Sequence, residues 1–202
     1  DDAHVTTLIE SVPVILAELK KSGNAVHKVQ YFCGYGCITI PQTKDHKHKI
    51  WSYREEWQTR ISLTNMLLAI PTLTEGGIFC NKIQDGHSRV SSDLAWITKQ
   101  FFDKVFIYEP RCMGWIGRRY IVGIGYRELK GMDSLEYLKQ LTQQYEKPEG
   151  IPLTLLEDPQ PGTERDRFLK QEYEPQMEAC DREIEKNFKV VFEFIRNYEQ
   201  HW

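Results

Sequence analysis

The chain has 202 residues and a net charge of −3; 41% of its residues are hydrophobic and 12% are aromatic. This length suits one folded domain with additions at its edge, and the hydrophobic share excludes a disordered chain. No apolar run reaches the roughly 20 residues that span a bilayer, and no signal peptide opens the chain, so we expect an intracellular protein, cytoplasmic or nuclear, without a membrane anchor.

The charge gives no global basic field, so any nucleic-acid site must be a local patch. The five cysteines are odd in number and scattered, which predicts buried free thiols in a reducing compartment and no disulfide framework.

The first predicted element is an amphipathic helix, because apolar residues recur at helical spacing from Val5 to Leu19. Pro13 is tolerated only in a first turn, so Ser11 is the expected cap of a second helical segment that ends at Gly23. This helix is predicted to cover one face of a sheet.

The next stretch, Val26–Ile40, is rich in β-forming residues and is broken by Gly34 and Gly36. It predicts either two short strands or one strand and a turn. Gly34-Tyr35-Gly36 could suggest a phosphate loop, but a nucleotide-binding motif needs a further glycine that opens a helix, and the sequence continues as strand. We therefore interpret it as a structural turn.

A short basic loop follows at residues 44–49, and aromatic residues come directly after it. Its lysines could contact phosphates while an aromatic ring stacks on a base. The alternative is a solvated loop whose aromatic residues anchor the next helix, and the sequence leaves both interpretations open. His46 and His48 lack partners at zinc-site spacing, so no metal site is predicted. The candidate RNA contacts here are Lys44, Lys47, Lys49, Trp51 and Arg54.

A helix is predicted over residues 55–70 and ended by Pro71, and it precedes the most regular part of the chain. Apolar β-rich runs at Ile78–Ile83, Val105–Tyr108 and Tyr120–Gly125 are separated by a helical segment and then by a short loop. Ser91-Ser92-Asp93 is expected to cap that helix, which carries Leu94, Ile97 and Phe101 on one face. The last two strands need no crossover, so the last strand is predicted to run antiparallel to its neighbours.

The spacing of Leu73, Gly76, Gly77, Lys82, Ile83 and Gly86 resembles the FtsJ-like RNA ribose 2′-O-methyltransferases. Their late strand reads approximately L-x-x-G-G-x-x-x-x-K. The resemblance extends to Glu109-Pro110 and to residues 117–122, which match a family pattern K-P, then S-E-R-Y-hydrophobic-V. It implies the C-terminal part of a three-layer α/β/α Rossmann-like methyltransferase sheet with an antiparallel last strand. It also implies that Lys82 is a catalytic residue, one of two Lys, one Asp and one Glu that steer a ribose hydroxyl onto S-adenosylmethionine.

Three of those four catalytic positions are not retained. Arg118 stands where the family has Glu, and a guanidinium only donates hydrogen bonds. Gly34 stands where the Asp is expected, and the remaining position, a Lys, falls in sequence that this chain lacks. Residues 1–25 also hold no candidate for the Gly-rich cofactor loop. Arg118 beside Lys82 would favour a bound anion such as a phosphate, so Arg118 and Arg119 join the predicted RNA-binding residues.

The C-terminal part is predicted to hold a helix between Leu129 and Leu141, a Pro-rich connector over 147–162 and a long helix over 163–202. Apolar residues from Tyr173 to Tyr198 are spaced by three or four, which predicts a seam that either packs back onto the domain or docks a partner helix. Pro175 places the start of its regular part near Gln176. Residues 1–146 then form the methyltransferase-like domain.

Two functions follow from these features of the sequence. The first is a catalytically degenerate methyltransferase-like module that binds RNA or, through its C-terminal helix, a protein. The alternative is an active RNA 2′-O-methyltransferase that uses S-adenosylmethionine and whose cofactor-binding half lies outside this chain. Whether the chain is an enzyme is left open; the absent carboxylates and cofactor loop favour the first function, and no cofactor is expected for this chain alone.

Overall fold

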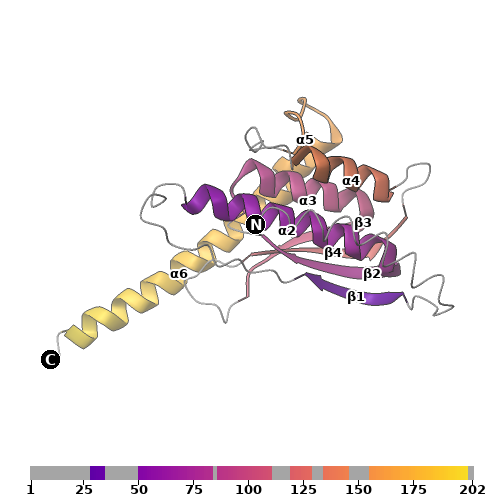
Figure 1. Cartoon of the computed structure of the whole chain (residues 1–202). Helices are drawn as coiled ribbons and strands as arrows, with labels where there is room; N and C mark the ends of the chain where they lie inside the picture. Colours follow the sequence, from indigo (N-terminus) through magenta and orange to yellow (C-terminus); the bar gives the residue numbers. More distant parts are fainter. Residues whose placement is uncertain are drawn as a thin grey trace.

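The computed structural model describes residues 28–34, 50–83, 86–110, 119–128, 134–145 and 155–199. Its sheet has four strands: β1 (Val29–Gly34), β2 (Leu73–Lys82), β3 (Phe102–Tyr108) and β4 (Tyr120–Tyr126), in the spatial order β1-β2-β4-β3 (Figure 1). β1 and β2 are parallel, whereas β4 lies between β2 and β3 and is antiparallel to both. The predicted antiparallel last strand is therefore confirmed.

The register divides the side chains of the sheet between two faces, because successive residues of a strand point to opposite sides. The row Phe32, Phe79, Gly123 and Val105 belongs to the inner face, which faces the core. Gly123 is required there, because a Cβ atom would come within 2.6 Å of the Phe102 ring. Phe102 in turn stacks on Phe79, with ring centroids 5.8 Å apart.

Two helices cover the inner face: α2 (Ile50–Thr72) packs on β1 and β2, and α3 (Arg89–Phe101) packs on β3 and β4. A third, α4 (Ser134–Tyr145), packs against α2, so the helices lie together above the sheet in Figure 1. α2 is longer than the predicted 55–70: it begins five residues earlier, and Pro71, the predicted end, falls inside its last turn. The fully buried large side chains are Leu63, Met66, Leu73, Phe79, Ile83, Leu94, Ile97, Phe101, Phe102, Ile121 and Leu138.

The start of α3 differs from the prediction. The cap is Ser88, whose hydroxyl accepts a hydrogen bond from the Ser91 amide at 3.2 Å. Ser91-Ser92-Asp93 lies inside the first turns, so the prediction that these residues cap the helix was wrong. Ser88 wins because it stands three residues before Ser91, the spacing at which a side-chain oxygen reaches a free amide of the first turn. The predicted apolar face is confirmed, since Leu94, Ile97 and Phe101 are buried.

The C-terminal helix begins close to where it is predicted. α5 (Glu164–Phe168) is capped by Thr163 and continues through a π-helical turn, Leu169–Tyr173, into α6 (Glu174–Glu199). Pro175 lies just after the π-helical turn, where the wider winding accommodates a residue without an amide hydrogen. The helix therefore starts at Glu164, next to the predicted bound at residue 163, and its regular α-helical part starts at Glu174, two residues before the predicted Gln176.

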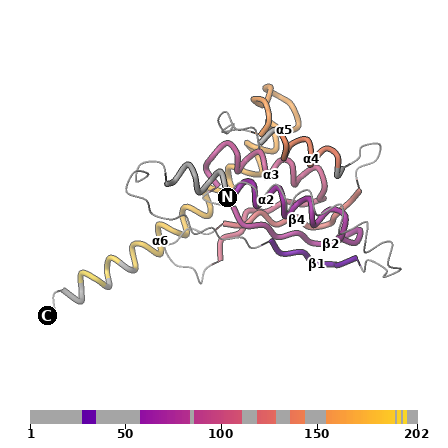
Figure 2. The backbone as a smooth tube through the Cα atoms, in the orientation of Figure 1, coloured from indigo at the N-terminus to yellow at the C-terminus, as the bar shows by residue number. Residues whose placement is uncertain are grey.

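The first half of α6 lies along the β3 edge of the sheet, and its second half projects away from the domain (Figure 2). The side-chain oxygen of Gln176 accepts a hydrogen bond from the Ile107 amide at 2.7 Å, which satisfies a donor of an edge strand. Of the seam residues, Met177 and Cys180 are buried and Ile184 and Phe188 are half-buried, whereas Ile195 is 45% exposed. The predicted seam thus packs back onto the domain only along its first half.

The fold is therefore mixed α/β with a four-stranded sheet and a long C-terminal helix. The helix predicted over 5–23 lies outside the described residues, and so does the second helical layer that it would form. The short strand predicted around residues 37–40 also lies outside them. Within the described part of the chain, no helix is long and apolar enough to cross a membrane.

Candidate functional site

The candidate site lies at one edge of the sheet, where the carboxyl ends of β1, β2 and β3 meet the amino end of β4. Gly34 pairs with Asn81, while Lys82 pairs with Tyr120, which pairs in turn with Tyr108. In open α/β sheets, ligands bind outside the carboxyl ends of the strands. The register therefore puts Lys82 at the edge where chemistry or binding is expected.

Side chains of α2 hold the end of β2 in place. The Lys82 carbonyl accepts hydrogen bonds from Gln58 Nε2 at 3.0 Å and from Ser62 Oγ at 3.1 Å. Asn81 Nδ2 donates to the Ser62 carbonyl at 3.2 Å. These polar groups are buried, and Lys82 itself is only 8% exposed. The backbone that carries Lys82 is consequently fixed by a satisfied polar network, which is how a positioned side chain is supported.

The position predicted to have lost an Asp is closed by a neighbour. A Cβ atom at Gly34 would lie 2.3 Å from Asn65 Nδ2 and 2.9 Å from Asn65 Cβ, far below contact distance. Asn65 is held there by the hydrogen bond that its Nδ2 donates to Asn81 Oδ1 at 2.9 Å. An Asn65–Asn81 amide pair thus occupies the space next to Gly34, and a carboxylate there would require α2 to move.

Arg119, at the start of β4, is buried between two carboxylates. Its Nε donates to Glu109 at 3.2 Å, and its terminal nitrogen donates to Asp181 of α6. Burial alone would lower the pKa of Arg119, but the hydrogen bonds and charges of Asp181 and Glu109 prevail and raise it. His87 Nε2 also lies 3.1 Å from Asp181. This group, Glu109, Arg119, Asp181 and His87, is called the α6 latch below.

The latch changes the interpretation of Arg119. The guanidinium is 3% exposed and already faces two carboxylates, so it has little capacity left for a phosphate. Its backbone lies directly beside the end of β2, because the Ile83 amide donates a hydrogen bond to the Arg119 carbonyl at 2.9 Å. The structure therefore favours a structural role for this arginine over RNA contact.

The other predicted RNA-binding residues cannot be placed with Lys82. Lys44, Lys47, Lys49 and Arg118 lie outside the described residues, and Trp51 and Arg54 belong to the first turns of α2, where the side chains are not described. Their convergence into one basic surface stays a prediction.

Sequence reasoning missed a buried anchor on α3. Asp93 is fully buried and accepts hydrogen bonds from the amides of Leu155 and Leu156 at 2.8 and 3.1 Å, as well as from Arg89 and Arg165. It ties the connector and α5 to α3. An aspartate at the end of the predicted cap motif was the available signal, but its partners in the connector lie more than sixty residues away in the chain.

Sequence reasoning also missed a hollow of about 590 Å³ between the start of α3 and the π-helical turn. Its wall carries charges of both signs and includes His87, Ser92, Lys170, Tyr173, Met177 and Asp181. No motif marks it, because its two walls are about eighty residues apart. In the part of the chain that the structure describes, no three His, Cys, Asp or Glu side chains gather in a way that could hold a metal ion.

The described cysteines are free thiols, but they are not all buried. Cys180 is buried, Cys80 is half-buried and Cys33 is exposed, which corrects the prediction for Cys33. The reason is that Cys33 and Cys80 pair in register on the outer face of the sheet. Burial, followed by the neighbouring Cys33, raises the pKa of Cys80 to about 11, so this thiol stays protonated at neutral pH.

Comparison with known proteins adds no relative: no family model matches the chain, and no curated protein matches it significantly. The fold and the position of Lys82 define only the class of protein: a mixed α/β domain with a lysine at the carboxyl end of a central strand.

Proposed function

We propose that this chain is a catalytically inactive methyltransferase-like module that binds RNA. The observation that carries the proposal is the edge of the sheet at Lys82. The lysine stands at the end of β2, as the resemblance to FtsJ-like enzymes requires, while the place of the expected carboxylate beside it is filled by Asn65. Without that carboxylate, a ribose hydroxyl loses the acceptor that would orient it.

The course of β2 and β4 supports the methyltransferase-like part of the proposal. Gly76 has a positive φ of 77°, and a Cβ atom at Gly77 would lie 2.8 Å from the Thr74 carbonyl. The Gly-Gly pair therefore shapes the start of β2 and sets the distance to Lys82. The antiparallel insertion of β4 between β2 and β3 is also the sheet ending that the resemblance implies.

RNA is the proposed partner because the resemblance is to enzymes that hold a ribose beside this lysine. The experiment combines two titrations on one preparation: calorimetry with S-adenosylmethionine, and fluorescence anisotropy with short RNAs. We expect RNA binding without cofactor binding. Saturable binding of S-adenosylmethionine would favour the active methyltransferase instead. Absence of RNA binding would refute the proposal that the chain is an RNA-binding module.

Protein binding through α6 is a second candidate function, and the projecting half of the helix favours it. Ile195 of the seam is 45% exposed, and Val190 and Phe192, on either side of the seam position 191, are 66% and 65% exposed. A partner helix is the matching ligand. If the chain pairs with itself, sedimentation should show concentration-dependent dimers that disappear in a variant with Phe192→Glu; a monomer at every concentration would exclude self-pairing.

A further inference from the structure

The outer face of the sheet is the surface that the proposed site does not use. By the register, one row across it is Tyr31, Ile78, Ile124 and Lys104, and the next is Cys33, Cys80, Val122 and Phe106. A third row holds Lys82, Tyr120 and Tyr108. The described helices pack on the inner face and along the β3 edge, so the first two rows and Tyr108 form an open surface, called the outer face below.

Aromatic rings stand open at both sides of the outer face. Tyr31 on β1 is 57% exposed, while Phe106 and Tyr108 on β3 are 39% and 54% exposed. Three strand spacings separate β1 from β3, about 14 Å in all. Between them lie the half-buried aliphatic side chains of Ile78 and Val122. Flat rings spaced over such a distance can hold several unpaired bases at once.

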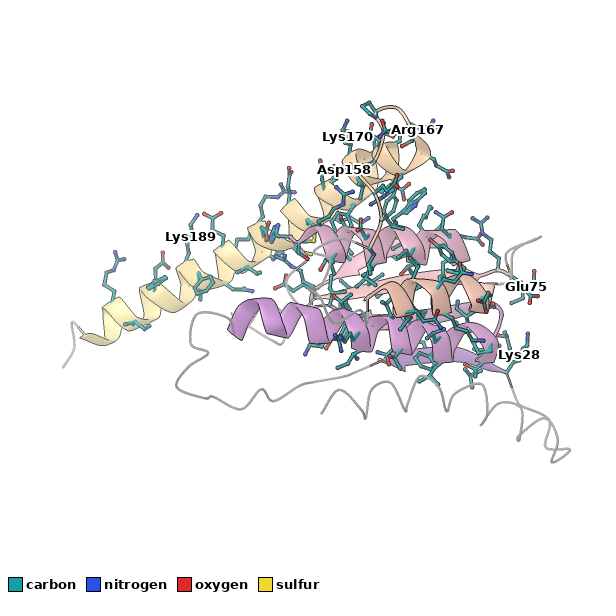
Figure 3. All side chains as sticks on the ribbon, turned by 45° about the horizontal axis from the view of Figure 1, so that its top comes forward. Lys28, Glu75, Asp158, Arg167, Lys170 and Lys189 are labelled. Atoms are coloured by element: carbon teal, nitrogen blue, oxygen red, sulfur yellow. The ribbon has the colours of Figure 1, made fainter. Side chains whose placement is uncertain are left out.

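The charge of the outer face fits a polyanion. The outer face contains Lys104 and no acidic side chain, although the whole chain is acidic on balance. Lys104 is exposed, and Lys28 is exposed just before β1. Glu75 lies near the start of β2, at the same end of the sheet as Lys28 in Figure 3, and it belongs to none of these rows. Burial, then the nearby thiols of Cys80 and Cys33, raise the pKa of Tyr31 to about 12, so its ring is uncharged at neutral pH.

We propose that the outer face is a stacking platform for single-stranded RNA, with bases on Tyr31, Phe106 and Tyr108 and a phosphate on Lys104. The inference rests on the proposed RNA-binding function and names the surface and the form of RNA. A duplex hides its bases from such a platform, so single strands are the ligand. Binding depends weakly on sequence, because every base has a face that can stack.

The platform is tested on the full chain with fluorescein-labelled single-stranded RNAs of about ten nucleotides, a length within the range that one sheet platform covers. Tyr31→Ala, Phe106→Ala and Tyr108→Ala should each weaken binding by about fivefold to a hundredfold. Tyr31→Phe keeps the ring and should bind as the wild type does.

Two further measurements separate the outer face from other surfaces. Bound RNA should slow alkylation of the exposed Cys33, followed peptide by peptide, and Lys104→Gln should reduce the slope of log K against log salt by about 0.7, the contribution of one phosphate on a single strand. Thermal unfolding of each variant verifies that the domain remains folded.

The outcomes distinguish this inference from the proposed function. If the wild type binds single-stranded RNA and the three alanine variants bind equally well, the platform is refuted and the RNA-binding function stands. If the wild type binds no RNA, the function itself fails. Duplex RNA bound more tightly than single strands, or a dimer in which Cys33 is protected without RNA, would also refute the platform.

Discussion

Single residues carry the tertiary structure where distant segments meet, and Asp93 is the clearest case. A fully buried carboxylate is costly unless every oxygen has a donor, and here two amides and two arginines supply the donors. From the local sequence, Asp93 is predicted to be part of a helix cap. The spacing of residues within one helix cannot reveal its partners in the connector.

The burial of Asp93 gives a stability prediction. Asp93→Asn should lower the free energy of unfolding by about 3 kcal/mol or more, because it leaves Arg165 without its buried counter-ion. The control is Asp158→Asn, since Asp158 pairs with Arg89 but is 88% exposed and should cost less than about 1 kcal/mol. Urea unfolding measures the free energy of unfolding of both variants. Equal decreases would show that the buried Asp93 contributes no more to stability than an exposed ion pair.

The α6 latch gives a pH prediction. Burial tends to raise the pKa of Asp181, but hydrogen bonds from His87 and Arg119 prevail and lower it below its ordinary value of 3.8. A carboxyl whose pKa is lowered by folding stabilises the fold above its unfolded-state pKa and loses that contribution as the pH falls through the folded-state value. From about pH 5 downward, the wild type should therefore lose more stability than Asp181→Asn does. Parallel losses in the two proteins would show that the latch carboxylate is not linked to folding.

At the scale of elements, the sequence predicts β2, α3, β3 and β4 well, because apolar alternation and helical spacing are strong there. It also predicts the antiparallel direction of β4, since a hairpin leaves little choice. Two errors share one cause. The extension of α2 through Pro71 and the cap at Ser88 depend on local hydrogen bonds at a helix end, from Thr72 to the Leu68 carbonyl and from the Ser91 amide to Ser88, which leave only weak marks in a sequence.

The contact between β1 and α2 gives a prediction at this scale. Gly34→Ala should destabilise the domain by about 1–3 kcal/mol, because the added methyl group would overlap Asn65. Asn65→Ala removes the obstacle, so Gly34→Ala should cost much less in that background. A double-mutant cycle by chemical unfolding measures this coupling; additive effects would mean that Asn65 does not close the position.

At the scale of the molecule, the strand edge around Lys82 follows from local sequence, whereas the outer face and the α6 latch follow only from the assembled sheet. The lysine is recognisable from its distance to Gly76 and Gly77. The outer face is not recognisable in the same way, because alternation along a strand does not say which face will be covered. The predicted division at residues 147–162 stays a prediction, although residues 155 and 156 are tied to α3 through Asp93.

We propose that this chain holds RNA and does not methylate it. Transfer needs the hydroxyl in line with the methyl group, and Asn65 lies against Gly34, the position at which the resemblance implies the carboxylate that would fix that geometry. The most direct measurement is transfer of a labelled methyl group from S-adenosylmethionine to short RNAs that the chain has been shown to bind, with Lys82→Ala alongside. We expect no product above background from either protein. Turnover by the wild type that disappears in Lys82→Ala would contradict the claim.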